Sequence, residues 1–343
     1  MKILCVGPTW RGSNAGGLFK AFLRLGHQVQ IVDEYYHIPL DAKSLKAKII
    51  SRLSRNTFIG EFNDRIRDAF IAFQPDLVLI YKGAFVRPET VTDVKKTGTP
   101  IINFFPDVSM FAHGQLLPQT MNLYDFVFTT KTFGLTDLRE KFGYTTAAFI
   151  PHGFDPDIHR PIKSADNPFV CDVSFIGTWS PKKEAVISEL VNSRYSLKVW
   201  GNQWEKTTTE AIRPTLENKE LLGDLYVMAI SGTAVNLGIL SEARIGSSNG
   251  DQITSRTFHI PAAGGFMLHE RTDEVQQCFE ESEEMACYGD TDELREKIKY
   301  YIEHPDERRR IAERGYERAL RDHSLDARAK EVLSILRREG LTT

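Results

Sequence analysis

The sequence predicts an α/β protein made of two doubly wound domains that face each other across a cleft. Short runs of β-forming residues alternate with longer stretches of helical spacing, and a proline- and glycine-containing break at residues 151–156 interrupts the alternation near its middle. Strands that alternate with helices of this length predict parallel sheets covered by helices on both faces. A length of 343 residues suits two domains of ordinary size better than one.

The first series of elements begins at the N-terminus. Lys2–Val6 has the composition of a buried strand, Gly17–Leu25 has helical spacing, and Gln28–Val32 returns to a strand, which makes one βαβ unit. The other elements expected in this domain are strands over 76–81, 101–105 and 126–130, and helices over 87–96 and 135–142.

A second series follows the break and contains strands over 170–176, 197–200 and 233–237, then helices from 292 onward. The predicted domains are therefore an N-terminal Rossmann-like domain over 1–155 and a C-terminal one over 156–320. A last helix over 321–343 can pack back toward the N-terminal domain.

Composition excludes several classes of partner. A hydrophobic content of 41% with 26% charged residues is typical of a soluble globular protein, and a net charge of −3 gives no reason to expect nucleic acid as a partner. The apolar run Ile3–Val6 is too short for a signal peptide or a membrane span, so we expect a cytoplasmic protein. The four cysteines show neither a CxxC pair nor zinc-finger spacing, so no disulfide or metal site is expected.

The segment Gly250–Gly265 is a candidate anion site. Residues that favour loops and helix N-caps directly precede an apolar run in it; they are Asp251, Thr254, Ser255 and Thr257. A helix that begins near Ser255 directs its free N–H groups and positive dipole end at whatever lies before it, and a diphosphate fits there. Arg256 adds further donors. The alternative is an ordinary capped helix with one solvated arginine.

The loop Gly7–Gly17 after the first strand carries glycines into a helix but lacks the GxGxxG spacing of a dinucleotide site. Asp33, at the end of the second strand, is too weak a sign to restore that interpretation, so no NAD is expected. Gly16 and Gly17 can still let a substrate approach the backbone closely, or they only permit a tight turn.

Several ordered motifs together carry a family resemblance. The C-terminal part contains Arg256–Gly265, Asp292–Leu294, Tyr300, Tyr301, Pro305, Arg308, Ile311, Ala312, Gly315 and His323. Ala15–Gly17, Leu25–Val29 and the interdomain segment Ile150–Asp155 match earlier signatures of the same group. This pattern resembles the CgeB-like branch of the group 1, family 4-like glycosyltransferases.

The resemblance implies a GT-B architecture, with an N-terminal acceptor domain and a C-terminal domain that binds a nucleotide-diphosphate sugar, without metal or other cofactor. In that group a basic residue six positions after a strand-ending glycine holds the donor diphosphate; Lys183 stands six positions after Gly177. The arginine that follows this glycine in the family is Thr178 here, so Arg256 is expected to replace it. A solvated lysine at a helix start is the alternative for Lys183.

The group also carries two acidic residues separated by seven positions, one near the transferred sugar and one on the ribose hydroxyls. Asp251 and His259 have this spacing. A neutral imidazole can give and accept one hydrogen bond but lacks the two acceptor oxygens of a carboxylate, which predicts weaker ribose binding. The alternative is that His259 is a neutral histidine in the core.

The resemblance implies transfer of a hexosyl group to a hydroxyl of a glycan, a lipid-linked glycan or a protein, with retention of configuration, as in polysaccharide biosynthesis. In the loop 106–114 after an expected strand, Asp107 and His113 are the candidates for orienting the acceptor hydroxyl or sharing its proton. Each can equally be a simple loop-forming polar residue. His152 is a third candidate and fits a hinge better.

Residues 41–56 form an expected helix with Leu45, Ile49 and Leu53 on one face and five basic residues around the rest. Such a helix can lie on an anionic membrane surface, here the inner face, or pack on the core with a solvated basic side. Two other functions remain open: a catalytically silent GT-B-like binding or assembly protein, and a GT-B-fold nucleotide-sugar epimerase.

Overall fold

The computed structural model describes residues 1–37, 54–162, 164, 166–191 and 194–342. It divides into two compact units. The first consists of Met1–Pro151, Ala243–Asn249 and Leu325–Thr343, and the second of His152–Glu242 and Gly250–Ser324. Both units are discontinuous in the chain, whereas the sequence analysis assigned one continuous segment to each domain.

The described part of the first unit contains a parallel sheet of six strands in the order β2-β1-β3-β4-β5-β6. Its strands are β1 (Lys2–Val6), β2 (Gln28–Val32), β3 (Leu77–Tyr81), β4 (Ile101–Phe105), β5 (Phe126–Thr129) and β6 (Ala147–Phe149). Its helices are α1 (Asn14–Arg24), α2 (Glu34–His37), α4 (Arg55–Phe73), α5 (Pro88–Lys95), α6 (Leu116–Thr120), the short 3-10 helix η1 (Met121–Leu123), α7 (Thr132–Phe142) and α14 (Leu325–Arg338).

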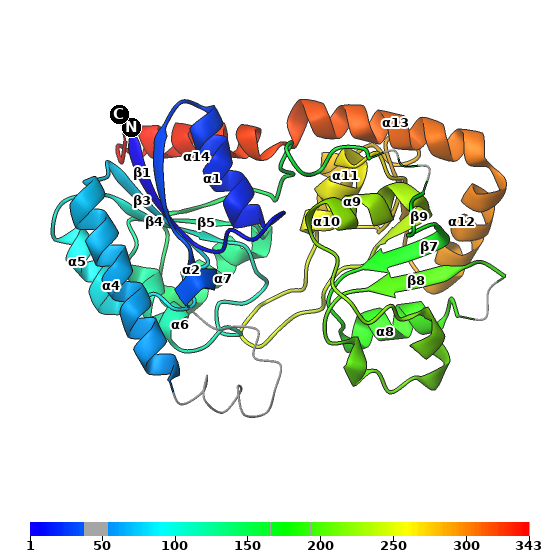
Figure 1. The fold of residues 1–343 in the computed structure, drawn as a ribbon, viewed down its shortest axis with the longest axis horizontal. Helices are drawn as coiled ribbons and strands as arrows, with labels where there is room; N and C mark the ends of the chain where they lie inside the picture. The colour runs from blue at the N-terminus through cyan, green and yellow to red at the C-terminus, as the bar shows by residue number, and fades with distance from the viewer. Residues whose placement is uncertain (38–53, 163, 165, 192–193, 343) are drawn as a thin grey trace. The chain divides into compact units, whose positions relative to one another are not determined.

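Alternate residues of the central strands pack on two different helical layers. Ile3 and Cys5 of β1 belong to the core under α1 and α14, and Leu4 and Val6 belong to the core under α4 and α5. This follows from the two-residue period of a strand, and it explains why these strands are almost uniformly apolar. Figure 1 shows α1 and α14 on one side of this sheet and α4 and α5 on the other.

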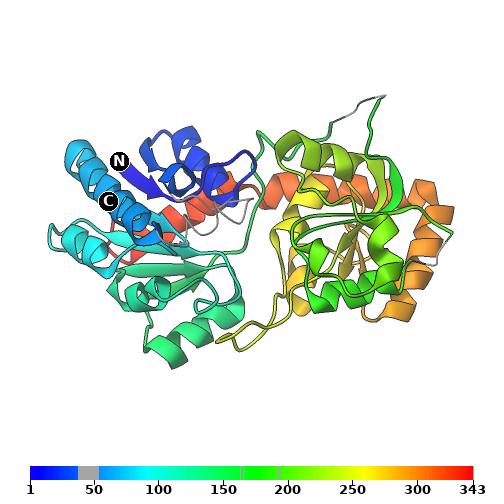
Figure 2. The same ribbon diagram turned by 60° about the horizontal axis from the view of Figure 1, so that its bottom comes forward.

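The described part of the second unit contains a parallel sheet of five strands in the order β11-β10-β9-β7-β8. Its strands are β7 (Cys171–Ile176), β8 (Leu197–Trp200), β9 (Thr233–Gly238), β10 (Met267–Glu270) and β11 (Ala286–Tyr288). Its helices are α8 (Pro181–Ser188), α9 (Gly223–Gly232), α10 (Ser255–Ala262), α11 (Asp273–Cys278), α12 (Thr291–Glu303) and α13 (Pro305–Asp322), with the short η2 (Trp204–Lys206) and η3 (Glu210–Thr215). The turned view of Figure 2 shows helices around this sheet as well.

The predicted fold class, two Rossmann-like α/β domains with parallel sheets, is confirmed. The strands over Lys2–Val6 and Gln28–Val32 are confirmed to the residue. The helix expected over Gly17–Leu25 begins earlier, at Asn14, because the Ser13 hydroxyl accepts a hydrogen bond from the Gly16 amide at 3.0 Å. Gly16 and Gly17 therefore lie buried inside the first turn of α1, not in a loop before it.

The C-terminal helix α14 completes the hydrophobic core of the first unit by packing on α1. Five of its residues are at most 5% exposed in the core under α1; they are Leu325, Ala329, Val332, Leu333 and Leu336. An ion pair between Arg24 and Asp326, at 2.6 Å, joins the same two helices. Because this core is shared, the first unit depends on residues more than 300 positions apart.

Leu336→Ala should lower the free energy of unfolding by about 2–4 kcal/mol, because the side chain is fully buried and its removal leaves a cavity under α1. Urea denaturation measures the change. Leu23→Ala on α1 is the control: this leucine is 48% exposed, so a change below about 0.5 kcal/mol is expected. Equal losses in the two variants would contradict the packing described for α14.

Candidate functional site

In the second unit, the first turn of α10 lies against the carboxyl ends of three parallel strands. The Arg256 guanidinium donates to the carbonyl of Ile239, just after β9, at 2.8 Å. Thr257 and His269 of β10 are joined by a hydrogen bond of 2.9 Å. An ideal Cβ on Gly177, just after β7, would lie 2.8 Å from Arg256 Nη1 and 2.8 Å from the Phe175 ring, so a larger residue there would have to displace these side chains. Helix α10 begins at Ser255, as predicted.

Arg256 is partly buried, and its guanidinium lies 5.1 Å from the ring centre of Phe175 in a cation–π contact. Its Nε makes no hydrogen bond within the described part of the chain. Burial lowers the pKa of Arg256, while Tyr226 and Asp251 act in the opposite direction. The arginine is thus a positive charge held at the strand ends, not the solvated side chain of the alternative interpretation.

Lys183 lies at the ends of β7 and β9, two of the three strands that α10 contacts. It lies in the first turn of α8, which Ser180 caps, and is only 4% exposed. Its ammonium donates to the Thr178 carbonyl at 3.2 Å and to the Ser241 hydroxyl at 3.0 Å. The interpretation of Lys183 as a solvated lysine is therefore wrong. The Thr178 side chain itself is exposed.

Asp251 and Thr254 lie in the segment that leads into α10. Asp251 is 9% exposed, and its amide donates to the Ser241 carbonyl at 2.8 Å, which places it beside the residue that holds Lys183. Thr254 is the N-cap of α10, and its amide donates to the hydroxyl of Thr257 at 3.0 Å. The structure thus brings Gly177, Lys183, Asp251 and Arg256 to one edge of the sheet.

His259 lies in a buried cluster of rings. Its imidazole stacks on that of His159 with 3.8 Å between ring centres, and Tyr226 packs edge-on against both. Burial, followed by the neighbouring His159 and His152, lowers the pKa of His259 well below its ordinary value, so the ring is neutral. This packing agrees with the core-histidine alternative; a contact with ribose stays a prediction.

Three acidic residues at this edge were missed by the sequence analysis. Glu270, at the end of β10, pairs with Lys182 at 2.6 Å and accepts from the Leu240 amide at 3.1 Å. Glu242 accepts from the Ser180 hydroxyl at 2.8 Å. Glu184 accepts from Trp179, Thr208 and Thr209, and although burial alone would raise its pKa, these bonds lower it to about 2. Two of these residues follow strand ends and the third lies in the first turn of α8, and these positions could have indicated from the sequence that they belong to a site.

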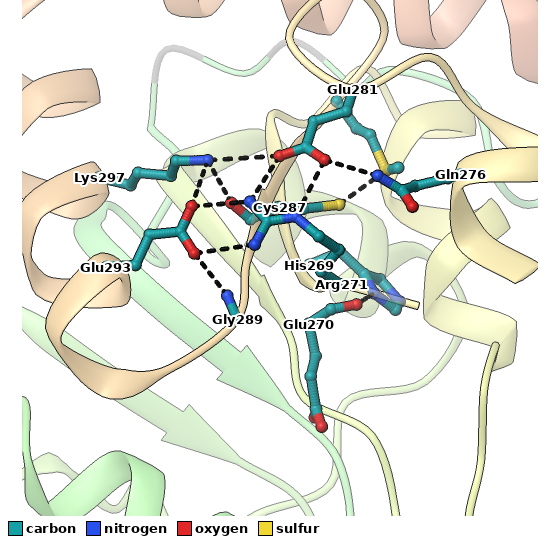
Figure 3. A network of polar contacts seen from close by, with 10 residues as sticks. His269, Glu270, Arg271, Gln276, Glu281, Cys287, Gly289, Glu293 and Lys297 are labelled. Carbon is teal, nitrogen blue, oxygen red and sulfur yellow. Dashed lines mark hydrogen bonds and ion pairs between the residues drawn. The ribbon is translucent and has the colours of Figure 1, made fainter. Parts of the chain in front are cut away.

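A network of ion pairs joins the segment between β10 and β11 to helix α12 (Figure 3). Arg271 donates to Glu281 and to Glu293, each at 2.7 Å, and Lys297 pairs with Glu293 at 2.9 Å. The Gly289 amide donates to Glu293 at 2.7 Å. Hydrogen bonds from Arg271 hold the pKa of Glu293 well below its usual range. Since two carboxylates already neutralise Arg271, it is a structural cation and a poor candidate for binding an anion.

In the first unit, Asp107 follows β4, forms an ion pair with Lys82 and lies within contact distance of the His113 imidazole. Its Oδ2 lies 2.8 Å from Lys82 Nζ and 2.9 Å from His113 Nε2. Desolvation would raise the pKa of Asp107, but Lys82 and His113 outweigh it and hold the pKa far below its ordinary value. The two predicted residues, Asp107 and His113, are therefore in contact, and Lys82 joins them.

The sequence analysis missed Lys82, because what distinguishes this residue is its backbone conformation and not a sequence motif. It follows β3 with a φ of 65°, a left-handed conformation that non-glycine residues rarely adopt. The buried Asn103 donates to the Lys82 carbonyl at 3.1 Å, and Gly83 follows with a φ of 84°. Such a strained backbone beside a charged cluster is typical of functional sites.

The loop 106–114 is held by the segment Ala243–Asn249, which belongs to the same unit. The Ser109 hydroxyl donates to the Ile245 carbonyl, and Lys141 donates to the Gly246 carbonyl. Gly246 has a φ of 75°, and an ideal Cβ there would lie 2.3 Å from the Phe111 ring. This segment lies in sequence between Ser241 and Asp251, so the loop that carries Asp107 is tied to a stretch bordered by residues of the second unit's site.

Three other predicted features are a third candidate residue, the basic helix and the absence of a metal site. His152 is 7% exposed and lies near His259. Residues 41–53 of the expected basic helix lie outside the described residues. Among the described helices, none combines the length and apolarity needed to cross a membrane. No group of His, Cys, Asp and Glu side chains within the described residues has the arrangement to hold a metal ion.

Comparison with known proteins agrees with this architecture. Residues 182–334 match a family model described as glycosyl transferase-like. Sucrose-phosphate synthase from Thermosynechococcus elongatus is similar over 98% of both chains, with 12% identity and a TM-score of 0.67. Anabaena HepE in complex with UDP-glucose has 15% identity and a TM-score of 0.63, over 97% of this chain and 99% of that one.

UDP-GlcNAc 2-epimerase from Neisseria meningitidis, bound to UDP-GlcNAc, covers 98% of this chain and 100% of its own, with 13% identity and a TM-score of 0.53. No curated protein matches the chain in sequence. Likeness at these identities shows the fold, which is GT-B. The glycosyl transferase-like family match agrees with this fold and covers residues 182–334 only.

The buried histidines of the second unit predict a loss of stability in mild acid. Burial lowers the pKa of His159 and of His269 to about 4 each, and that of His259 well below 6.5. Because the unfolded chain takes up protons near pH 6.5 and the folded chain does not, stability is present above pH 6.5 and is lost as the pH falls toward 4. Each histidine contributes up to about 1.4 kcal/mol per pH unit.

Urea denaturation between pH 7.5 and 4.5 measures this effect, and His159→Phe should flatten the pH dependence relative to the wild type. The range stays above the pKa of the paired carboxylates of the site, such as Glu184 at about 2. A stability difference between the two proteins that is constant over this range would contradict the neutral state of His159.

Proposed function

We propose that the protein transfers a glycosyl group from a nucleoside-diphosphate sugar to a hydroxyl acceptor. The observation that carries this proposal is the convergence of Lys183, Arg256 and the first turn of α10 on the ends of β7 and β9. Two cations and a helix N-terminus at the carboxyl edge of a parallel sheet suit a diphosphate. The glycosyl transferase-like family match over residues 182–334 covers most of these elements.

The proposed chemistry follows from charge. As the bond between the sugar carbon and the diphosphate breaks, negative charge develops on the departing oxygens while the sugar becomes oxocarbenium-like. Lys183 and Arg256 stabilise the leaving oxygens, with the α10 amides, and Asp251 lies near the transferred sugar. In the first unit, Asp107 and His113 orient the acceptor hydroxyl, and Lys82 keeps Asp107 ionised.

Finer features of the proposal rest on the family resemblance. They are membership in the CgeB-like branch, retention of configuration, activity without a metal, hexosyl transfer and a role in polysaccharide biosynthesis at the cytoplasmic side of a membrane. The glycan or lipid-linked acceptor belongs to the same group of proposals. UDP-sugars are the first donors to test, because the Anabaena HepE structure contains UDP-glucose.

A GT-B-fold nucleotide-sugar epimerase is the second candidate, because the fold is also similar to that of UDP-GlcNAc 2-epimerase. Incubation with UDP-GlcNAc and no acceptor separates the two functions. Formation of an epimer of the nucleotide sugar would favour the epimerase, and transfer to an added hydroxyl compound would favour the transferase. A silent binding protein would bind the nucleotide without either reaction.

Lys183→Met and Arg256→Met should each weaken binding of UDP by roughly 10- to 100-fold, since each removes a charge-assisted hydrogen bond to the diphosphate. Calorimetry with UDP, and with GDP and the corresponding sugars if UDP does not bind, measures the change. Lys299→Met is the control, because Lys299 is an exposed lysine of the same unit on α12.

Unliganded melting temperatures of the variants separate lost binding from lost folding, because Lys183 is buried. Wild-type affinity in both variants would contradict the diphosphate site. Binding of no nucleotide by the wild-type protein would contradict the proposed function itself.

A further inference from the structure

The segment Ala243–Asn249 is built around a β-turn over residues 244–247. The Ser247 amide donates to the Arg244 carbonyl at 3.0 Å, and the Ser247 hydroxyl donates to the same carbonyl at 2.8 Å. Gly246, the third residue of the turn, has a φ of 75°, which suits the glycine-favouring third position of a type II turn. The segment therefore presents a defined set of backbone groups to the first unit.

Helix α7 of the first unit holds this turn through a buried carboxylate. Asp137 is only 5% exposed, and its Oδ2 accepts a hydrogen bond from the Ser248 amide at 3.1 Å. Its Oδ1 pairs with Lys141 one helical turn later, and the ammonium of Lys141 donates to the Gly246 carbonyl. A carboxylate buried this deeply needs partners, and Asp137 takes them from Lys141 and from the backbone of the segment.

The turn also lies against the loop 106–114, which carries Asp107. An ideal Cβ on Gly246 would lie 2.3 Å from the Phe111 ring, so ring and backbone are in close contact. These two residues line one small cavity of about 10 Å³ together with Asp107 and Asp137. The loop of Asp107 thus packs on a turn that Asp137 holds in place.

The ends of the segment lead into the proposed nucleotide site of the second unit. The Asp251 amide donates to the Ser241 carbonyl at 2.8 Å, which closes the loop 242–250 at its base. The Ser241 hydroxyl accepts a hydrogen bond from Lys183 at 3.0 Å. A ligand bound beside Lys183 and Asp251 therefore restrains the base of the loop whose tip Asp137 holds.

We propose that Asp137 is a positioning residue for the transfer reaction, which holds the segment Ala243–Asn249 so that nucleotide binding at the base of this loop orders the acceptor loop 106–114. This inference rests on the proposed nucleotide site. A loop whose base is restrained by a ligand has less conformational freedom to lose when its tip packs, so the two events favour each other. Such coupling is reciprocal, so weaker contacts at the tip also weaken nucleotide binding.

Hydrogen exchange measured by mass spectrometry, with and without saturating UDP, tests this coupling, because exchange reports how often a backbone segment opens. GDP replaces UDP if calorimetry shows binding of GDP only. In the wild type, the nucleotide should slow exchange at 178–184, in its own site, and also at 106–114, where no nucleotide contact is proposed. In Asp137→Ala, the slowing at 106–114 should be lost and that at 178–184 should remain.

Transfer from UDP-glucose, or from the donor found by calorimetry, to methyl glycosides gives a second readout. The rate should fall by about 10-fold or more in Asp137→Ala, because a misplaced acceptor group strongly lowers the rate. Affinity for the nucleotide should fall by only about 5-fold, since Lys183 and Arg256 are unchanged.

Two further variants make the result specific. Glu140→Ala removes an exposed carboxylate from the same helix and should behave as the wild type. Gly246→Ala disturbs the turn itself, because its φ is strained for alanine and a Cβ would meet the Phe111 ring, and it should lose the slowing at 106–114 as Asp137→Ala does. Since Gly246 is exposed, this variant keeps the test available if the buried Asp137 proves necessary for folding.

Slowing at 106–114 that persists in either Asp137→Ala or Gly246→Ala would overturn the proposal and leave the proposed function intact. Faster exchange there without nucleotide, combined with an unchanged effect of the nucleotide, is the behaviour of a merely structural residue and would overturn it too. Wild-type transfer in Asp137→Ala, or no effect of the nucleotide at 106–114 in the wild type, would have the same meaning. Absence of nucleotide binding in the wild type would instead overturn the proposed function, and the role of Asp137 with it.

Discussion

The packing of Arg256 against the ends of β7 and β9 is the contact on which the site of the second unit depends. Its guanidinium bonds to the Ile239 carbonyl, lies beside the ring of Phe175 and fills the space that a side chain at position 177 would need. One side chain thereby fixes the start of α10 relative to two strands. In the proposed function, Arg256 supplies from the neighbouring helix the positive charge that an arginine at position 178 supplies in the family that the sequence resembles.

In the first unit, as in the second, charged residues follow the ends of parallel strands. The central charged group of the first unit is the carboxylate of Asp107, whereas that of the second unit is the guanidinium of Arg256. Parallel strands end at one edge of a sheet, so Lys82 after β3 and Asp107 after β4 meet although they are far apart in sequence. Lys82 and His113 stabilise the negative charge of Asp107.

The segment Ala243–Asn249 links these two sites through the chain itself. It packs on the loop of Asp107 through Ser109 and Phe111, and it is bordered in sequence by Glu242 and Asp251. Gly246 is required there because both its φ angle and the nearby Phe111 ring exclude a side chain. This segment, which connects two elements of the second unit in sequence, therefore belongs to the first unit and holds the loop 106–114 there.

The sequence by itself determined the fold class, most strands, the start of α10 at Ser255 and Arg256 as a cation beside that start, because these depend on local periodicity and capping. Lys183 was indicated by a family resemblance, and the structure places it at the ends of β7 and β9. The sequence did not reveal the short strands β6, β10 and β11. The tertiary structure alone decided that His259 stacks on His159 and that Lys82 meets Asp107. It also identified α1 as the helix on which the last helix, expected to pack back toward the N-terminal domain, is packed. Each of these depends on residues distant in sequence that only the folding of parallel strands and their helices brings within reach, so burial and the resulting pKa values cannot be read from local pattern.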